Sequence, residues 1–158
     1  METTRHFTAT TYVVNDGATA LHEHGRLGIR IPPGGHIERD ELPHETAIRE
    51  TREETGLEPT LIDDSPEVAG PSGRSLPRPR HVVLYDINVH EDGSVGHQHV
   101  DLLYYASVPT REIDPADGEA SADVWDWYTP ADLRASEIDA DTVQLGIEAI
   151  ETVESATR

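Results

Sequence analysis

Cysteine and lysine are both missing from this 158-residue sequence. Without cysteine the chain has no disulfides, no thiolate metal ligands and no cysteine nucleophile. No apolar run reaches the roughly 18 residues that a membrane-spanning helix needs. The first ten residues, METTRHFTAT, also lack the apolar core of a signal peptide. We therefore expect a soluble, cytoplasmic protein that does not insert into a membrane.

Aromatic residues are scarce as well, at 5% of the chain, so aliphatic side chains must supply most of the core. A chain of this length has room for one domain with a sizeable core. It shows neither an internal repeat nor a linker that would separate a second domain. We predict a single domain over residues 1–158.

Positive charge is the third scarcity. The formal net charge is −19, and arginine accounts for all 12 basic residues. Such a chain repels nucleic acid phosphates, which argues against DNA or duplex RNA as a partner. The acids are spread along the chain and are not gathered in a tail, which favours a solvated surface suited to high internal salt over an acidic interaction surface. The composition thus indicates a halophilic source.

The pattern of β-rich runs, turns and periodic apolar residues predicts a mixed α/β chain. Strands are expected over 7–14, 18–24, 59–63, 81–89, 100–108 and 123–129, with a short one before the Pro-Pro-Gly-Gly loop at 32–35. Turns or loops are expected over 15–17, 24–28, 69–80 and 90–99. A short capped helix at 129–136 and an amphipathic helix from Asp139 onward close the chain.

A helix is predicted over residues 43–55, because Pro43 suits its first turn and Gly56 suits the position just past its end. At about 100° per residue, Glu50, Glu53 and Glu54 fall within one arc of this helix. Like charges at this spacing repel each other and weaken a helix. Either this face is simply solvated, or a cation binds to it.

The residues before the helix favour the cation. Gly34 and Gly35 allow backbone carbonyl groups to approach a ligand closely. A carbonyl beside three carboxylates is an all-oxygen ligand set, which suits Mg²⁺ or Mn²⁺. A metal ion there would relieve the repulsion, neutralise a pyrophosphate substrate and polarise an attacking water.

The same stretch resembles the signature of the Nudix hydrolases (MutT-like proteins). That signature is Gly, five residues, Glu, seven residues, Arg-Glu, an aliphatic residue, any residue, Glu-Glu, any residue, Gly and an aliphatic residue. Residues 35–57 match every charged and glycine position, and the one departure is Thr51 in place of an aliphatic side chain. The matching residues are Gly35, Glu41, Arg49, Glu50, Glu53, Glu54, Gly56 and Leu57.

The resemblance implies an α/β/α sandwich with a mixed β-sheet, and a divalent-metal-dependent hydrolase. Its substrate would be a nucleoside diphosphate linked to another moiety: a nucleoside triphosphate, a sugar nucleotide or a dinucleotide polyphosphate. The metal ligands it implies are Glu50, Glu53, Glu54 and the Gly34 carbonyl. A homodimer is a common family habit. The alternative is a Nudix-like domain that senses nucleotides or sugar nucleotides without hydrolysis. Such domains commonly lose acids of the signature or carry an attached DNA-binding module. This chain keeps the acids and has no room for such a module, which disfavours the alternative.

The resemblance also assigns supporting roles. Glu41 and Arg49 would pair with each other or with neighbours and hold the loop against the helix, and Glu50 or Glu54 would orient or deprotonate the water. Some family members draw the base from a later loop. The candidates in that loop are Glu112, Glu119, Asp114 and Asp117.

Three further groups of residues are candidates for substrate or metal contact. Arg74, Arg78 and Arg80 either clamp phosphate oxygens or pair with local acids. His99 is a candidate for the substrate pocket. The His-x-His pairs at 22/24 and 97/99 put two rings on one strand face, where they either ligate a transition metal or serve as polar surface. Aromatic candidates for base stacking or core packing are Trp125, Trp127, Tyr104 and Tyr105.

Overall fold

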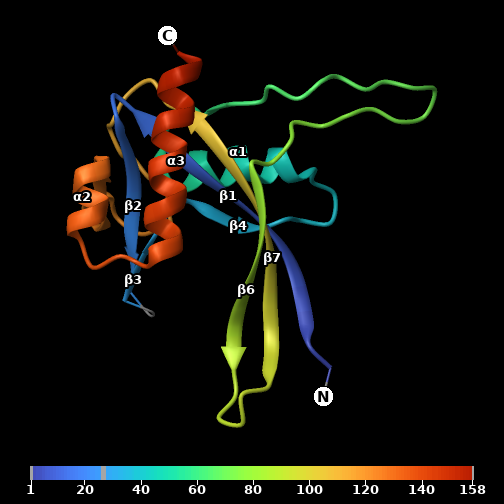
Figure 1. Cartoon of the computed structure of the whole chain (residues 1–158), viewed down its shortest axis with the longest axis horizontal. Helices are drawn as coiled ribbons and strands as arrows, with labels where there is room; N and C mark the ends of the chain where they lie inside the picture. Colours follow the sequence, from blue (N-terminus) through green and yellow to red (C-terminus); the bar gives the residue numbers. More distant parts are fainter. Residues whose placement is uncertain (1, 26–27, 158) are drawn as a thin grey trace.

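The computed structural model describes residues 2–25 and 28–157 (Figure 1). Its strands are β1 (Thr4–Asn15), β2 (Ala18–His24), β3 (Ile29–Ile31), β4 (Gly34–His36), β5 (Thr60–Leu61), β6 (His81–Val89), β7 (Val95–Ser107) and β8 (Trp125–Tyr128). Its α-helices are α1 (Pro43–Thr55), α2 (Pro130–Ala135) and α3 (Ala140–Ala156), and a 3₁₀ turn spans Ala122–Val124. The turn predicted at 24–28 includes residues 26 and 27, which lie outside the described residues.

These strands form one eight-stranded mixed sheet with the central order β3-β2-β1-β7-β5. The long strands β1 and β7 run parallel at its centre. The other pairings are antiparallel: β4 joins β1, β6 joins β7, and β8 joins β2. A parallel pair flanked by antiparallel neighbours is the mixed sheet that the sequence predicted.

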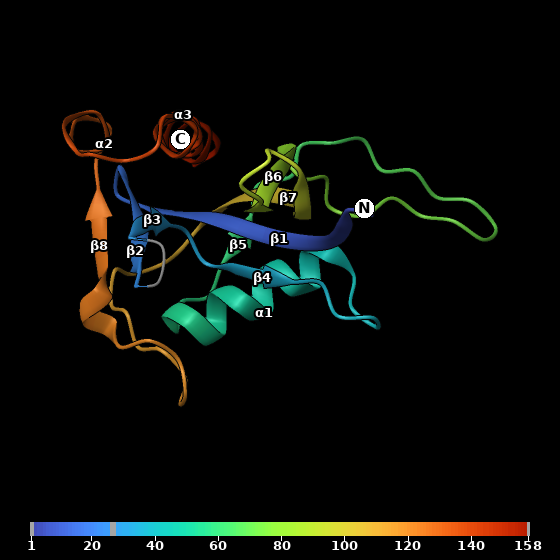
Figure 2. The same ribbon diagram turned by 90° about the horizontal axis from the view of Figure 1, so that it is seen from below.

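Helices cover both faces of the sheet. Seen along the sheet in Figure 2, α1 lies on one side of β1 and β4, and α3 with α2 lies on the other. On the α3 side, Tyr12 and Tyr105 of the sheet pack in one cluster with Ile150 of α3. On the α1 side, Ala9 and Tyr104 pack in one cluster with Ala47. The predicted α/β/α sandwich is thus confirmed, with helices packed on both faces of the sheet.

The predicted ends of several elements were correct, but two segments were misassigned. Gly34 and Gly35, predicted as part of the loop at 32–35, form the short edge strand β4 together with His36, because this segment pairs with residues 8–10 of β1. Residues 95–99, predicted as a connection, belong to β7, because the hairpin with β6 continues to Val95. Both errors have the same cause: the segment becomes a strand only because it pairs with another strand, and local turn propensity contains no information on that pairing.

None of the helices in the described part of the chain is both long and apolar enough to span a bilayer.

Candidate active site

Helix α1 is held in place at both of its ends. Pro43 occupies its first turn, and the Glu45 carboxylate accepts a hydrogen bond from the Leu42 amide at 2.8 Å. Beyond the other end, Gly56 has φ 72° and donates its amide to the Arg52 carbonyl. A Cβ at Gly56 would overlap the carbonyl of Asp114. The helix therefore ends where the loop after β7 packs against it.

The one departure from the signature, Thr51, is fully buried between α1 and the sheet. Its hydroxyl donates to the Ala47 carbonyl one turn earlier, at 2.8 Å. Because this bond satisfies the hydroxyl within the helix, the site accepts a β-branched polar side chain in a buried position.

Arg49 links the acidic side chains of the signature. Its Nε and Nη2 donate to both carboxylate oxygens of Glu41, at 2.6 and 2.8 Å. Its Nη1 donates to Glu50 at 3.0 Å and to Glu53 at 3.1 Å. Hydrogen bonding from Arg49 lowers the pKa of Glu41 to about 2. The predicted Glu41–Arg49 pair is present, and it ties the loop before α1 to the helix by a bidentate contact.

Glu54 and Glu50 are half-buried members of the acidic cluster. Burial raises the pKa of Glu54 to about 9, and the neighbouring Glu50 and Glu119 carboxylates act in the same direction. Burial also raises the pKa of Glu50, although Arg49 opposes the shift. The Oε2 atom of Glu54 is buried and has no hydrogen-bond partner. The raised pKa means that the site favours a protonated Glu54 as long as no cation compensates its charge.

Strand β4 brings its two glycines against these carboxylates. A Cβ at Gly35 would overlap the Glu50 carboxylate, so a side chain there would displace it. The Gly34 backbone acts against the rise in the pKa of Glu54. The glycine pair therefore lies against the acidic side chains of α1. The approach of its carbonyl groups to a ligand stays a prediction.

The loop after β7 contributes one of the four predicted late acids to this region. The Ala116 amide donates to the Glu53 carbonyl, and the Asp114 amide donates to the Thr55 carbonyl, each at 2.8 Å. These bonds fix the loop along the end of α1. Glu119 and Glu112 are both exposed, but only Glu119 lines the same cleft as Glu54.

A cleft of about 1540 Å³ opens beside these residues. Gly34, Glu54 and Glu119 line it together with the predicted pocket residue His99. Another part of its wall carries Trp125, whose ring lies 4.5 Å from that of His22. Of the other aromatic candidates, Tyr104 and Tyr105 are buried in the core.

Asp101 adds a buried acid to the cleft wall. It accepts hydrogen bonds of 2.9 Å from both Thr8 and Thr10. Burial raises the pKa of Asp101 to about 6, and the two threonine bonds act in the opposite direction.

The three loop arginines lie away from this cleft. Arg80 donates to Asp64 at 3.0 Å, and Arg78 lies 3.8 Å from the same carboxylate. Arg74 is exposed and forms an isolated bridge with Ala69. None of the three belongs to the residues that line the cleft within the described parts of the chain. Of the three predicted clamp residues, Arg78 and Arg80 thus pair with the same acid, Asp64, in this structure.

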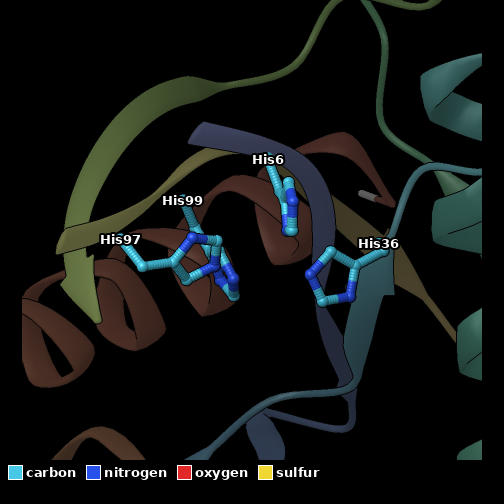
Figure 3. Close-up of side chains that lie close together, drawn as sticks. All are labelled: His6, His36, His97 and His99. Carbon is cyan, nitrogen blue, oxygen red and sulfur yellow. The ribbon is translucent and has the colours of Figure 1, made fainter. Parts of the chain in front are cut away.

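Sequence reasoning missed one group of polar side chains. His6 and His36 join His97 and His99 in a cluster on the sheet (Figure 3). The His-x-His pair was visible in the sequence, but its two partners lie more than 60 residues away, so no local pattern connects them.

The fold is an α/β/α sandwich with an acidic helix on one face of its sheet. The sequence matches the family profile described as NUDIX domain over residues 5–145. A NUDIX-family hydrolase from Clostridium perfringens shares 31% identity over 95% of this chain and 99% of that chain, with a TM-score of 0.80. The chain belongs to the Nudix hydrolase family, whose members are pyrophosphatase-type hydrolases that generally use divalent metals and act on nucleoside diphosphates linked to other moieties.

More distant structures share the fold. A MutT protein from Bacillus halodurans is 18% identical over 92% of this chain and 82% of that chain, with a TM-score of 0.62. A UDP-X diphosphatase is 14% identical over 100% of this chain and 66% of that chain, with a TM-score of 0.59. The comparison with curated proteins gave no match.

Proposed function

We propose that this protein is a Mg²⁺- or Mn²⁺-dependent hydrolase that cleaves the pyrophosphate bond of a nucleoside diphosphate linked to a second moiety. The proposal rests on the surroundings of the Glu54 carboxylate. Its Oε2 atom is buried without a partner, and it lies beside two other carboxylates. Burying a carboxylate against like charges is costly unless a cation or a proton compensates it.

The residues present fit a hard divalent cation. Glu50, Glu53 and Glu54 would hold it, with the Gly34 carbonyl as a fourth oxygen donor. The absent side chain of Gly35 leaves the Glu50 carboxylate accessible from the strand. All of these donors are oxygens, the class that Mg²⁺ and Mn²⁺ prefer. When bound, such a cation would offset the charge of the phosphoanhydride and increase the acidity of the attacking water.

Arg49 positions the carboxylates in this proposal. It holds Glu41 by two bonds and spans Glu50 and Glu53 with one nitrogen. Its positive charge offsets part of the repulsion along α1, so the acidic face persists before substrate arrives. Because the guanidinium group is planar and has several donors, a lysine at this position would not replace it.

Two carboxylates are placed to accept the proton of the attacking water. Glu54 becomes available once its own proton leaves, and its position on α1 fixes its orientation. Glu119 lies close enough to raise the pKa of Glu54 and is presented from the loop after β7. We propose Glu54 as the general base. We propose that the negative charge of Glu119 adjusts the pKa of Glu54.

The dimensions of the cleft favour a two-part substrate. Its volume of about 1540 Å³ exceeds the roughly 300–1,000 Å³ of ordinary small-molecule pockets. A sugar nucleotide or a dinucleotide polyphosphate carries a group on each side of the scissile anhydride. In this arrangement the anhydride lies at Glu54, and the base lies toward Trp125.

A substrate screen with product identification tests the function. Tag-free protein with Mg²⁺ is offered nucleoside triphosphates, sugar nucleotides and dinucleotide polyphosphates, and the released monophosphates are identified by chromatography. We expect turnover of at least one class that Glu50→Gln abolishes and Arg52→Gln, at an exposed signature position, retains. Tight nucleotide binding without any product from the whole panel would instead support the non-hydrolytic sensing role.

We further propose that the strong negative charge adapts the protein to high salt. Self-repulsion at a net charge of −19 weakens the folded state, and added salt screens it. Between about 0.1 M and 1 M salt the Debye length shrinks from about 10 Å to about 3 Å. The thermal midpoint should therefore rise with KCl concentration, and a midpoint that stays constant or falls would contradict the adaptation.

The homodimer implied by the family remains a proposal, for which the sheet offers a surface. Phe7 of β1 and the side chains of Val82 and Leu84 of β6 are 55–63% exposed. Phe7 and Leu84 both pair with Val100 of β7, so they flank one position of the sheet. We propose that a second copy of this chain covers this apolar face. Sedimentation of Leu84→Glu against the unmodified protein tests it, and an unchanged mass would exclude this interface.

A further inference from the structure

Four histidine side chains converge on the α3-bearing face of the sheet, at the wall of the cleft (Figure 3). His6 comes from β1, His36 from β4, and His97 and His99 from β7. Each offers one ring nitrogen, and all four nitrogens lie within 4.8 Å of one another. The chain has nine histidines in total, so close to half of them meet at one point.

Strand pairing fixes the backbone positions of this histidine cluster. His6 pairs with His99 in the parallel ladder of β1 and β7. His97, two residues before His99, points to the same face of the sheet. On the other edge of β1, His36 pairs with Thr8, which shares the face of His6. Three adjacent strands therefore preset the positions of the four rings.

The rings form a closed arrangement in which each is steeply inclined to its two neighbours. Their centroid distances are 5.2 Å (His6–His36), 5.0 Å (His36–His99), 5.0 Å (His97–His99) and 4.5 Å (His6–His97), with interplanar angles of 71–89°. Metal–nitrogen bonds of about 2.0–2.1 Å would place neighbouring ring centroids on the order of 5 Å apart. The observed spacing matches that of four imidazoles around one ion.

The donor chemistry selects the class of ion. Imidazole nitrogen suits Zn²⁺, Ni²⁺ and Cu²⁺, whereas Mg²⁺ and Ca²⁺ require oxygen ligands. His97 and His99 are half-buried and anchor one side, while His6 and His36 are exposed and leave an entry path from solvent. We propose that His6, His36, His97 and His99 bind a divalent first-row transition-metal cation of the Zn²⁺ and Ni²⁺ class.

This histidine site is separate from the acidic cluster, although β4 contributes to both. A Cβ at Gly35 would meet Glu50, whereas a Cβ at Gly34 would meet the Thr10 hydroxyl on the opposite face. Because side chains alternate along a strand, His36 points to the face of Gly34 and away from Glu50. The two sites therefore share a strand but no ligand. The proposal stands without the proposed function.

A bound cation would join β4, β1 and β7 at positions remote from each other in sequence. A ligand that binds the folded state and not the unfolded one stabilises the fold by mass action. The thermal midpoint should therefore rise with Zn²⁺ or Ni²⁺, even in excess Mg²⁺, which would occupy the acidic oxygens.

Calorimetric titration of tag-free protein with Zn²⁺, and separately with Ni²⁺, in excess Mg²⁺ tests the site. We expect one equivalent per chain. Loss of an outer-shell partner typically weakens a metal site roughly 10–100-fold, so removal of a ligand in His6→Gln or His97→Gln should weaken it by at least that factor. His90→Gln, on the β6–β7 connection outside the cluster, is the matched control and should keep the affinity.

A second measurement uses the unmodified protein, so its result does not depend on whether the variants fold. In nitrogen-15 spectra of the unmodified protein, one equivalent of Zn²⁺ should shift the ring nitrogens of the four cluster histidines and leave His90 in place. The proposal fails if His6→Gln and His97→Gln bind as tightly as His90→Gln. It also fails if Glu50→Gln abolishes Zn²⁺ binding, because the ion would then belong to the acidic cluster.

Discussion

The acidic cluster of α1 and the histidine cluster lie on opposite faces of β4 and are built in contrasting ways. The acidic cluster comes largely from one helix, and Arg49 compensates its charge from within that helix. The histidine cluster comes from three strands, and the described residues bring no carboxylate into it. Residues that are close in sequence can carry their own counter-charge, whereas residues gathered by a sheet depend on the fold for their positions.

The largest expected effect is on hydrolysis, which we expect to depend on the acidic cluster and not on the histidine cluster. Glu50→Gln removes a proposed metal ligand, so kcat/KM on the hydrolysed substrate should fall by more than the roughly 10–100-fold that loss of an outer-shell partner of a metal site costs. The same variant should leave the Zn²⁺ affinity of the histidine site unchanged. Steady-state kinetics and calorimetry on one preparation measure both. Equal losses in both assays would mean that the clusters form one site.

The next effect tests how the acidic cluster is held together. Arg49→Lys keeps the charge but loses the fork that binds Glu41, so the free energy of unfolding should fall by about 2 kcal/mol. Urea denaturation measures this. Arg52→Lys serves as the control, because its ion pair with Glu58 is exposed and should contribute less than about 1 kcal/mol. Similar losses in both variants would show that Arg49 has no special role.

A smaller effect depends on pH and involves Glu41. Its pKa is lowered to about 2 from an ordinary value of 4.5, so the folded state favours the ionised carboxylate. The resulting stability is present above about pH 4.5 and is lost as the pH falls through about 2. After screening by solvent it should amount to about 1–2 kcal/mol.

Urea denaturation of the unmodified protein and of Glu41→Gln across this pH range measures the difference. The two curves should be separated at neutral pH and should converge in acid. A separation that stays constant with pH would rule out the Glu41–Arg49 pair as its source.

The smallest effect concerns the long loop between β5 and β6. Arg78 is mostly exposed and lies 3.8 Å from Asp64, outside the cleft lining. Arg78→Gln should therefore change kcat/KM by less than about twofold, in line with the small energies of exposed ion pairs. A loss of tenfold or more would mean that the loop moves to the substrate and acts as the phosphate clamp that the sequence predicted.

Local signals in the sequence were sufficient for the acidic helix and for most of the strands. Pro43 and Gly56 bracket the helix at the observed residues, and the signature spacing placed Glu41 within reach of Arg49. The sheet edge was harder, because the assignment of Gly34–His36 depended on pairing with β1. The late acids could not be ranked either, since the backbone bonds that dock their loop on α1 involve residues some 60 positions apart.

By itself, the sequence determined the family, the acidic helix and its Arg49 counter-charge, because these features repeat at the short spacings of one helix. The tertiary structure decided which distant residues meet: it brought Glu119 to Glu54, placed Arg78 and Arg80 on Asp64 and gathered four histidines on three strands. The physical reason is that strand register and loop docking are set by pairing and burial across the whole sheet, and no short stretch of sequence contains that information.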